Sequence, residues 1–570
     1  MALGLALTAP AWAQQDTDAR FKQIYRQEWA WRTGQSGISA SGESQPNNGR
    51  LDQVDAKSQQ ERLDEWRKVI SQLDAIDVKQ LSPAEQVNYA VYREQIRNFN
   101  ADQQFQQWQM PFNSDSAFWS ELSDDLEGDE LRTEGDYRHY VDRLGQVPVY
   151  FDQQIANMRA GLKRGFSVPR AVLAGRDVSI AAVADVKDPT QTGFYAPLQH
   201  MPSNIPVATA AAIQADARAK IGHDVIPAYA KLLTFFRNEY MPQARTTLAA
   251  EALPDGKDYY RQQIREYTTL DLDPEAIHEI GLKEVARIDA QMRETMQATG
   301  FKGDFPAFLK FLRSDSQFYA KTPEELLMHA AWIAKRVDGK LSQFFGLLPR
   351  GRFGIEPVPA AIAPFWTAGR GSARTYWVNT YDLPSRPLYN LTALTLHESA
   401  PGHSLQGALS EEHKAQPEFR SKSYISAYGE GWALYCEKLG KEMGIYQTPY
   451  DDFGRLSYEM WRAARLVIDT GIHHKGWTRA QAIGYLAERT ALSQHEVETE
   501  VDRYISWPGQ ALSYKLGEIK ILELRARAEK QLGPKFDIRA FHDAVLAEGS
   551  VPLPVLEQRI DAFIAAQKQL

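Results

Sequence analysis

Helix-start signals recur along this chain of 570 residues, and they constrain its fold more than any other feature. Amphipathic runs with apolar residues at three- and four-residue spacing lie between these signals, at 59–76, 208–240 and 456–469. We therefore predict a mainly α fold, with loops over 34–50 and 185–206, where turn-forming residues gather. The signals include capping-box spacings at Ser82–Glu85 and Ser493–Glu496, and proline at the first helical position after Ser82, Asp273 and Thr448.

The segment His-Glu-Ser-Ala-Pro-Gly-His holds two histidines around a glutamate. Its imidazoles, His397 and His403, can ligate a Zn²⁺ that keeps one position open for water, and Glu398 can take the proton from that water. The histidines are six residues apart, a rotation of roughly 240° on an ideal helix, so a regular helix would point them apart. Pro401 and Gly402 lie between them and permit a local unwinding that returns His403 to the metal. An ordinary helix end at Pro-Gly is the alternative interpretation.

A zinc site needs a third protein ligand, and Glu430 on a later helical segment is the first candidate. It lies between two glycines at the start of an apolar run, and a carboxylate on a buried helix needs a cation or hydrogen-bond donors. Glu437 lies seven residues further along the same helical face. It is the second candidate, either as a ligand or as an acceptor for a ligand histidine.

Four ordered motifs give the chain a family resemblance. Together they cover the part from about Leu348 onward, which resembles the bacterial DUF885 family. That family resembles the gluzincin metallopeptidases, which implies two histidine ligands, one glutamate ligand, a catalytic glutamate and a helical fold with a deep substrate channel. We therefore expect a large two-lobed, metallopeptidase-like fold with one Zn²⁺ per chain. The motifs are His397–His403, Gly429-Glu-Gly-Trp-Ala-Leu-Tyr435, Arg465-Leu-Val-Ile-Asp-Thr-Gly-Ile-His473 and Asp502-Arg-Tyr-Ile-Ser-Trp-Pro-Gly-Gln-Ala-Leu-Ser-Tyr-Lys-Leu-Gly517.

The helical pattern is interrupted over 351–379, where β-branched and aromatic residues favour extended chain. A small β-sheet next to the metal-binding helix is predicted. An edge strand there can pair with an extended peptide through backbone hydrogen bonds, although a purely structural hairpin is the alternative. The candidate substrate-binding residues are Arg374, Tyr376, Val378 and Asn379.

Amide hydrolysis also needs a donor that stabilises the oxyanion. The candidates, in order of preference, are Tyr514, His473, Arg503 and Tyr504. Each also has an ordinary structural interpretation: a packed tyrosine, an arginine in an ion pair, or a histidine at the carboxyl end of a helix.

The composition excludes several other classes of protein. A net charge of −8 and a pI near 5.9 leave no basic surface for nucleic acid and no attraction to anionic membranes. Cys436 is the only cysteine, so the chain has no intramolecular disulfide, no cysteine-rich zinc site and no Cys-x-x-Cys redox site. We expect Cys436 to be a buried thiol and not a nucleophile.

Residues 1–13 have a short apolar stretch and end in Ala11-Trp-Ala13, which is typical of the end of a secretory signal peptide. The usual positive segment is missing, as in a truncated or misassigned start, and the stretch is too short to span a bilayer. We predict a periplasmic or secreted protein. Its expected parts are a helical lobe over 14–347 and a zinc-binding catalytic lobe over 348–570, joined in one globule.

These observations predict zinc-dependent hydrolysis of peptide bonds, with Glu398 as general base. A helical channel admits only an extended chain, so we expect short unstructured peptides as substrates. We expect no nucleic-acid partner, and no membrane partner after signal removal. A zinc-dependent amidase or esterase acting on a non-peptide substrate would use the same residues. A non-catalytic peptide-binding protein is a further alternative, but it would have no use for Glu398.

Overall fold

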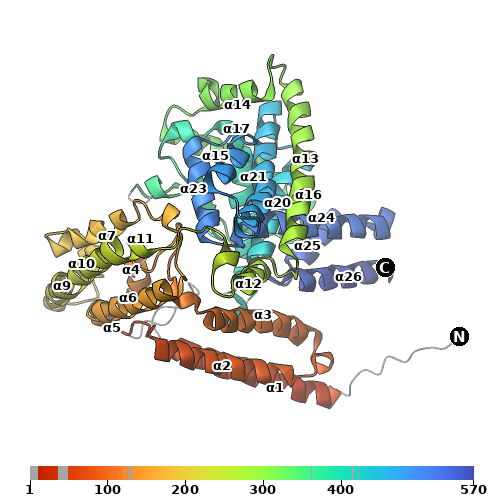
Figure 1. Ribbon diagram of the computed structural model, residues 1–570. Helices are drawn as coiled ribbons and strands as arrows, with labels where there is room; N and C mark the ends of the chain where they lie inside the picture. The colour runs from red at the N-terminus through yellow and green to blue at the C-terminus, as the bar shows by residue number, and fades with distance from the viewer. Residues whose placement is uncertain are drawn as a thin grey trace. The chain divides into compact units, whose positions relative to one another are not determined.

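The structure is a computed structural model, and it describes residues 11–35, 49–120, 122–127, 131–360, 363–413, 416–421 and 423–569. These residues are mainly helical, as predicted (Figure 1). The chain divides into two compact units, Met1–Leu248 with Ala252–Asp255 and Ala249–Glu251 with Gly256–Leu570. The boundary expected at residue 348 falls inside the second unit. Most of the predicted signal peptide, and most of the loop predicted over 34–50, lie outside the described residues.

The first unit is built of helices. Ser82 caps α3 by accepting a hydrogen bond from the backbone of Glu85, but its own backbone N–H donates to Asp18, so only half of the predicted capping box forms. The segment 185–206, predicted as a loop, contains short helical turns, α8 among them. The helices are α1 (Ala11–Gln35), α2 (Ala56–Asp74), α3 (Pro83–Phe105), α4 (Leu122–Glu127), α5 (Glu134–Leu144), α6 (Val147–Arg164), α7 (Asp177–Ala184), α8 (Ala196–Gln199), α9 (Val207–Lys220), α10 (Ile226–Phe235) and α11 (Met241–Gln243).

The second unit combines helices with one small sheet. Among the described residues of both units, no helix combines the length and the apolar character that a membrane crossing requires. The helices are α12 (Gly256–Thr268), α13 (Pro274–Ala298), α14 (Phe305–Ser314), α15 (Pro323–Asp338), α16 (Leu341–Phe344), α17 (Leu388–Glu398), α18 (His403–Glu412), α19 (Glu418–Ser421), α20 (Ser426–Glu442), α21 (Pro449–His473), α22 (Arg479–Ala487), α23 (Gln494–Ser506), α24 (Ser513–Leu532), α25 (Ile538–Leu546) and α26 (Leu553–Gln569).

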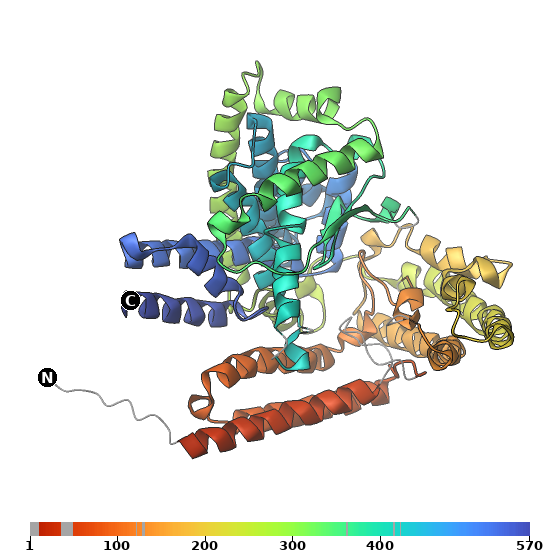
Figure 2. The same ribbon diagram turned by 180° about the vertical axis from the view of Figure 1, so that it is seen from behind.

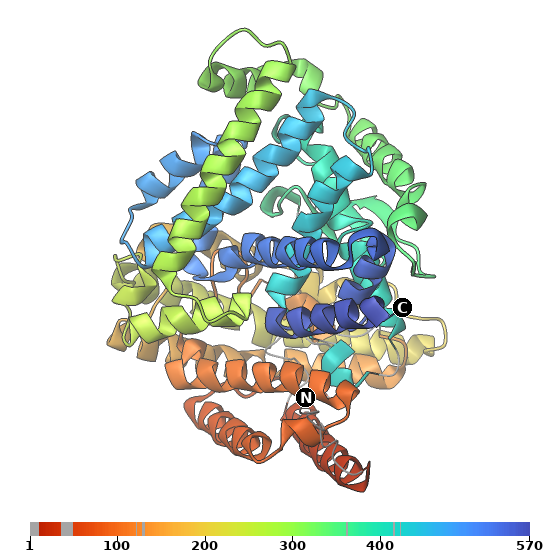
Figure 3. The same ribbon diagram turned by 90° about the vertical axis from the view of Figure 1, so that its right-hand side faces the viewer.

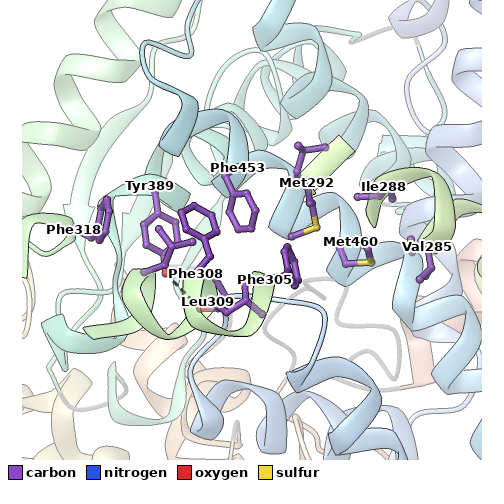
Figure 4. Close-up of a cluster of buried hydrophobic side chains, with 14 of the residues drawn as sticks. Val285, Ile288, Met292, Phe305, Phe308, Leu309, Phe318, Tyr389, Phe453 and Met460 are labelled. Atoms are coloured by element: carbon purple, nitrogen blue, oxygen red, sulfur yellow. Dashed lines mark hydrogen bonds between the residues drawn. The ribbon is translucent and has the colours of Figure 1, made fainter. Parts of the chain in front are cut away.

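Helix α21 runs through the second unit, with α13 alongside it (Figure 3). Thr448 and Asp451 form a reciprocal capping box at its start, as the sequence predicts, and every residue from Phe453 to His473 is buried. A cluster of apolar side chains from α13, α14, α17, α21 and the short turn Ser316–Phe318 holds these helices together (Figure 4). Burial of such side chains is the main stabilising contribution to a fold. The cluster includes Val285, Ile288, Met292, Phe305, Phe308, Leu309, Phe318, Tyr389, Phe453 and Met460.

The predicted small sheet is present, with strands β1 (Gly354–Pro357), β2 (Gly369–Gly371) and β3 (Thr375–Val378) (Figure 2). Its order is β1-β3-β2, with β1 parallel and β2 antiparallel to β3. The segment 374–379 carries the candidate substrate-binding residues, but it does not provide an edge strand. Strand β3 is central, because both of its sides are occupied by strand partners.

Candidate metal centre

The two candidate histidines come from two different helices. Helix α17 ends at Glu398, α18 begins at His403, and the turn between them contains a cis peptide bond before Pro401. The indole N–H of Trp432 on α20 donates to the carbonyl of Pro401 at 2.9 Å and fixes this turn. The rings of His397 and His403 lie 4.9 Å apart at an interplanar angle of 85°. The helix is therefore interrupted where the sequence predicts it, and the interruption brings the two rings together.

Glu430 on α20 reaches both rings. Its Oε2 atom lies 3.4 Å from Nε2 of His397 and 3.4 Å from Nε2 of His403, and the three ligand atoms lie within 4.8 Å of one another. A tetrahedral zinc ion with bonds of about 2.1 Å separates its ligand atoms by about 3.4 Å. An N–H···O hydrogen bond is shorter, up to about 3.2 Å. The spacing therefore matches the edge of a metal tetrahedron better than a hydrogen bond.

The two glycines beside Glu430 allow close approaches on its two sides. A Cβ at Gly431 would lie 2.5 Å from the backbone of Gly517, so only glycines permit α20 and α24 to cross at this distance. A Cβ at Gly429 would lie 2.4 Å from the ring of Tyr424. The hydroxyl of Tyr424 donates to Oε1 of Glu430 at 3.0 Å. The glycines thus bring α24 and a tyrosine to the candidate ligand.

Glu437 takes the second of the two roles predicted for it. Its Oε1 atom lies 2.7 Å from Nδ1 of His397, and both side chains are buried. A hydrogen bond from Nδ1–H to this carboxylate leaves the Nε2 lone pair of His397 directed at Glu430, which is the tautomer that a metal requires. Arg462 on α21 lies 3.7 Å from the same carboxylate oxygen. Glu437 is therefore an acceptor behind the site and not one of the converging ligands.

The electric field at the site favours a positive charge. Burial lowers the pKa of His397, but the adjacent carboxylates of Glu430 and Glu437 and the nearby charge of Glu398 outweigh burial and raise this pKa to about 10. Burial raises the pKa of the Glu430 carboxyl, but His403 and His397 outweigh that effect and hold it well below its usual range. These groups attract either protons or a metal cation.

Glu398 is oriented by strand β2. The backbone N–H of Gly371 donates to Oε2 of Glu398 at 2.7 Å. A Cβ at Gly371 would lie 1.9 Å from the carbonyl oxygen of Glu398, so any side chain there would push the strand away from α17. The glycine therefore makes this hydrogen bond possible.

Two of the four predicted oxyanion donors, Tyr514 and Arg503, are connected to the candidate ligand His397. The ring of Tyr514 stacks at 6.5 Å from the ring of His397, with an interplanar angle of 19°. Arg503 donates to the hydroxyl of Tyr514 at 3.4 Å and to Gln510 at 2.6 Å. The guanidinium of Arg465 covers the Tyr514 ring at 4.2 Å. Tyr514 is thus the predicted donor that the structure brings nearest to a candidate ligand, and Arg503 reaches it through a hydrogen bond.

The other two predicted donors are engaged elsewhere. The hydroxyl of Tyr504 accepts from Trp461 at 2.8 Å and from Arg465 at 2.9 Å. His473 is fully buried, with Nδ1 3.1 Å from the backbone N–H of Ala250 and Nε2 2.8 Å from the carbonyl of Tyr504. Both ring nitrogens of His473 therefore bind backbone groups. Contacts of this kind are typical of residues that stabilise a fold.

The predicted substrate-binding residues lie on and beside β3. Tyr376, Val378 and Asn379 are buried, and the amide of Asn379 donates to three backbone carbonyls. Arg374 is exposed and pairs with Glu411 at 3.3 Å. Contact of these four residues with a substrate stays a prediction, and their burial and pairing do not favour it.

Comparison with known proteins agrees with the motifs. The family model described as "Bacterial protein of unknown function (DUF885)" matches residues 33–560. The chain belongs to this family. A comparison with curated proteins gave no match. Among solved structures, a "putative lipoprotein" from Colwellia psychrerythraea is similar to this DUF885 chain with a TM-score of 0.87 and 28% identity, over 97% of this chain and 100% of that one. A "putative lipoprotein of unknown function" from Shewanella oneidensis shares the fold, with a TM-score of 0.71 and 18% identity over 96% and 99% of the two chains.

Sequence reasoning missed two contacts of this DUF885 site. Tyr424 precedes the predicted motif around Glu430 by several residues, and only the glycine beside Glu430 hints at a neighbour in close contact. Gly371 lies in the predicted extended segment, where a glycine can indicate a close backbone approach. Neither glycine shows which residue it contacts, because that residue is distant in sequence or belongs to another element.

Proposed function

We propose that this DUF885 protein is a zinc-dependent peptidase. The observation that carries the proposal is the convergence of His397 Nε2 and His403 Nε2 on Glu430 Oε2, each at 3.4 Å, beside a second, oriented carboxylate, Glu398. Two histidines and a glutamate are a donor set that catalytic zinc sites use with an open fourth position. A zinc ion held there would lower the pKa of a bound water and polarise a carbonyl group.

Glu398 is the proposed general base. It directly follows a ligand residue in sequence but lies outside the converging donor set, and the hydrogen bond from Gly371 occupies one of its oxygens. The other oxygen is available to accept a proton from water and to return it to the leaving amine. This hydrogen bond also fixes the rotamer of Glu398. Less conformational entropy of this side chain is therefore lost when the transition state forms.

Tyr514 is the proposed donor to the oxyanion. Its hydroxyl accepts from Arg503, which leaves its own proton for a substrate oxygen, and Arg465 over its ring favours developing negative charge nearby. Tyr424 has a different proposed role. Its hydroxyl donates to Glu430 and would orient this ligand, as hydrogen bonds behind a metal ligand generally do.

The proposed substrates are short unstructured peptides. Among the described strands, β2 has a partner on one side only, and its other side faces Glu398. An extended peptide laid along β2 would therefore present its backbone to the general base. The proposal includes the two-lobed, metallopeptidase-like fold with a substrate channel that the resemblance to gluzincins implies, and export from the cytoplasm.

Metal analysis and peptide hydrolysis together test this function. Purified protein should hold about one zinc per chain, release amino groups from a mixed peptide library, lose this activity with a chelator and regain it with zinc. Alanine at His397, His403 or Glu430 should abolish both zinc binding and hydrolysis, whereas Glu324→Ala, at an exposed position of α15, serves as a matched control. Hydrolysis that persists in the metal-free protein would overturn the proposal.

A further inference from the structure

Three arginine side chains surround the ring of Tyr514, next to the candidate metal centre. The guanidinium carbons of Arg465 and Arg462 lie 4.2 Å and 5.9 Å from the centre of this ring. Arg503 donates to the hydroxyl of Tyr514 at 3.4 Å, and the same ring stacks at 6.5 Å from the ring of His397. One tyrosine thus connects a group of three positive charges with a candidate metal ligand. A single oxyanion donor does not require three cations around it, so the group needs a further explanation.

The carboxylates that pair with these arginines among the described residues are two. Glu500 lies 2.7 Å from Nη2 of Arg465 and 3.3 Å from Nη1 of Arg503. Burial raises the pKa of Glu500, but the two arginines outweigh it and lower this pKa to about 2, so Glu500 is ionised. Glu437 lies 3.7 Å from Arg462 and is also bound to a candidate ligand histidine. Within the described part of the chain, three guanidiniums therefore share two carboxylates.

The charges of Arg462 and Arg465 are buried. These residues are 4% and 2% exposed, and neither Nε of Arg462 nor Nη1 of Arg465 has an acceptor among the described residues. Their guanidiniums lie 4.1 Å and 4.6 Å from the ring of Trp461, and an aromatic face attracts a cation less strongly than a counter-ion does. Charges that are removed from water act over longer distances than exposed ones. The two arginines therefore favour an anion in the neighbourhood of Tyr514.

A third carboxyl group, that of Glu496, does not cancel this field. Ser493 caps α23 by accepting from the backbone N–H of Glu496, but the Glu496 carboxylate does not close the predicted capping box. Burial raises the pKa of Glu496 to about 7, and Arg386, Arg462 and Arg465 offset only part of that effect. The group is therefore not fully ionised at neutral pH.

Arg503 is the member of the group that a substrate can reach. Its side chain is 12% exposed, close to the 14% of the candidate ligands His403 and Glu430. The partly exposed ring of Trp507 lies 5.8 Å from its guanidinium. A guanidinium is a planar fork of N–H donors that matches the two oxygens of a carboxylate. Arg503 thus offers a carboxylate-binding group one tyrosine side chain away from the candidate metal centre.

We propose that Arg503 binds the C-terminal carboxylate of the peptide substrate, so that the enzyme removes a short fragment from the C-terminus. Water adds to the scissile carbonyl carbon, the C–N bond breaks, and the leaving amine takes the proton from Glu398. The fragment that leaves spans the distance from the metal centre to Arg503. An extended chain advances about 3.3 Å per residue, so this fragment has about one to three residues. The inference rests on the proposed peptidase function, because it assigns the substrate class of the same site.

Two peptides that differ only at the C-terminus test this assignment. One ends in a free carboxylate and the other in an amide, which removes the charge and keeps the size. The free acid should be cleaved with a kcat/KM about 10- to 100-fold higher, the usual range for a hydrogen-bonded charge. Mass spectrometry should show fragments lost from the C-terminus, and acetylation of the N-terminus should not change the acid-to-amide ratio. Cleavage inside long peptides blocked at both ends, as fast as in free ones, overturns the inference.

Substitutions of Arg503 locate the contact. Arg503→Gln should remove most of the acid-to-amide ratio, and Arg503→Lys should retain part of it. Any effect that acts through the hydroxyl of Tyr514 is common to both peptides, so the ratio isolates the contact with the carboxylate. Arg293→Gln, the same charge change at an exposed position of α13, should keep the full ratio. A ratio that survives Arg503→Gln overturns the inference.

A binding measurement separates this inference from the proposed function. Calorimetry with zinc-loaded Glu398→Gln protein should show tighter binding of the acid than of the amide, and Arg503→Gln in that background should equalise the two. If the wild type cleaves no peptide, the peptidase proposal fails, and the difference in binding still decides the carboxylate site. Equal binding of both peptides overturns it. Circular dichroism confirms that each variant is folded, and the comparison of acid and amide on the wild type decides the outcome if the Arg503 variants are not.

Discussion

Two groups of polar residues in the second unit gave similar signals in sequence but have different surroundings. Around the candidate metal centre, Nε2 of His397 and Nε2 of His403 each lie 3.4 Å from Oε2 of Glu430, too far for good hydrogen bonds. In the group around α21 and α23, His473 and Tyr504 bind their neighbours at 2.8 to 3.1 Å. The first group is spaced like a set of metal ligands, whereas His473 and Tyr504 in the second group are held by hydrogen bonds.

This difference gives a criterion for separating residues of a functional site from residues that only stabilise the fold. A buried polar side chain whose donors and acceptors are all bound at hydrogen-bond distance stabilises the fold, because leaving such groups unpaired costs about 1–3 kcal/mol each. A set of converging ligand atoms that do not bind one another at hydrogen-bond distance gains free energy from a cation that supplies positive charge. The predictions below test whether the criterion sorts these residues correctly.

The largest expected effect on turnover belongs to Glu398. Glu398→Gln preserves the shape of the side chain and its hydrogen bond from Gly371, but cannot accept a proton from water. Turnover should fall by roughly 10²- to 10⁴-fold or more, with zinc content and circular dichroism unchanged. Peptide should still bind and raise the melting temperature by mass action.

Two outcomes would contradict this assignment of Glu398. Near-normal turnover of the variant would exclude it as the base. A loss of zinc would show that Glu398 holds the metal, either directly or through an orienting contact. Elemental analysis alongside steady-state kinetics distinguishes the two.

A pair of matched substitutions compares the two groups directly. Tyr514→Phe removes the proposed oxyanion donor, so kcat should fall by about 10²- to 10³-fold while zinc remains bound. Tyr504→Phe removes the same atom from the scaffold and should lower the melting temperature while leaving kcat within a few-fold. Kinetics and thermal melts on both variants check this prediction, and a reversed pattern would place the oxyanion donor at Tyr504.

Much of the fold was predictable because local signals determine it. Thr448, Asp273 and Ser493 cap their helices as expected, since a cap needs only residues within one turn. The central position of β3 was not predictable, because strand order depends on contacts between distant segments. A three-residue strand such as β2 carries almost no pattern of its own.

The candidate site divides in the same way. The break between His397 and His403 followed from Pro401 and Gly402, and the structure confirms that the helix is interrupted there. The surroundings of His473 depend on Ala250, more than 200 residues away. No spacing rule could show that its ring nitrogens are already bound.

A smaller effect on turnover is expected for Glu437. Glu437→Gln keeps the size of the side chain but weakens the hydrogen bond that orients His397, so zinc affinity should fall by about 10- to 100-fold, with activity recovered at saturating zinc. Competition with a chelator measures the affinity. Glu442→Gln, at an exposed position at the end of α20, is the control. Complete loss of zinc at saturation would make Glu437 a ligand.

Substitution of Asp469, a buried residue of α21, is expected to leave turnover unchanged and to affect only stability. This buried carboxyl accepts hydrogen bonds from Tyr260 and from the backbone of Gly509, and burial outweighs them and raises its pKa from 3.8 to about 7. Because the folded-state pKa is raised, its contribution to stability is fully present below about pH 4 and is lost as the pH rises through about 7. The shift corresponds to at most about 4 kcal/mol. Asp469→Asn imitates the neutral form and keeps an oxygen acceptor, so it should melt above the wild type at pH 8 and exceed it by clearly less at pH 5, with kcat unchanged at both. Thermal melts at the two pH values check this, and a wild type that gains stability over the variant as the pH rises would show that Asp469 is ionised in the folded protein and belongs with the groups that bind a cation.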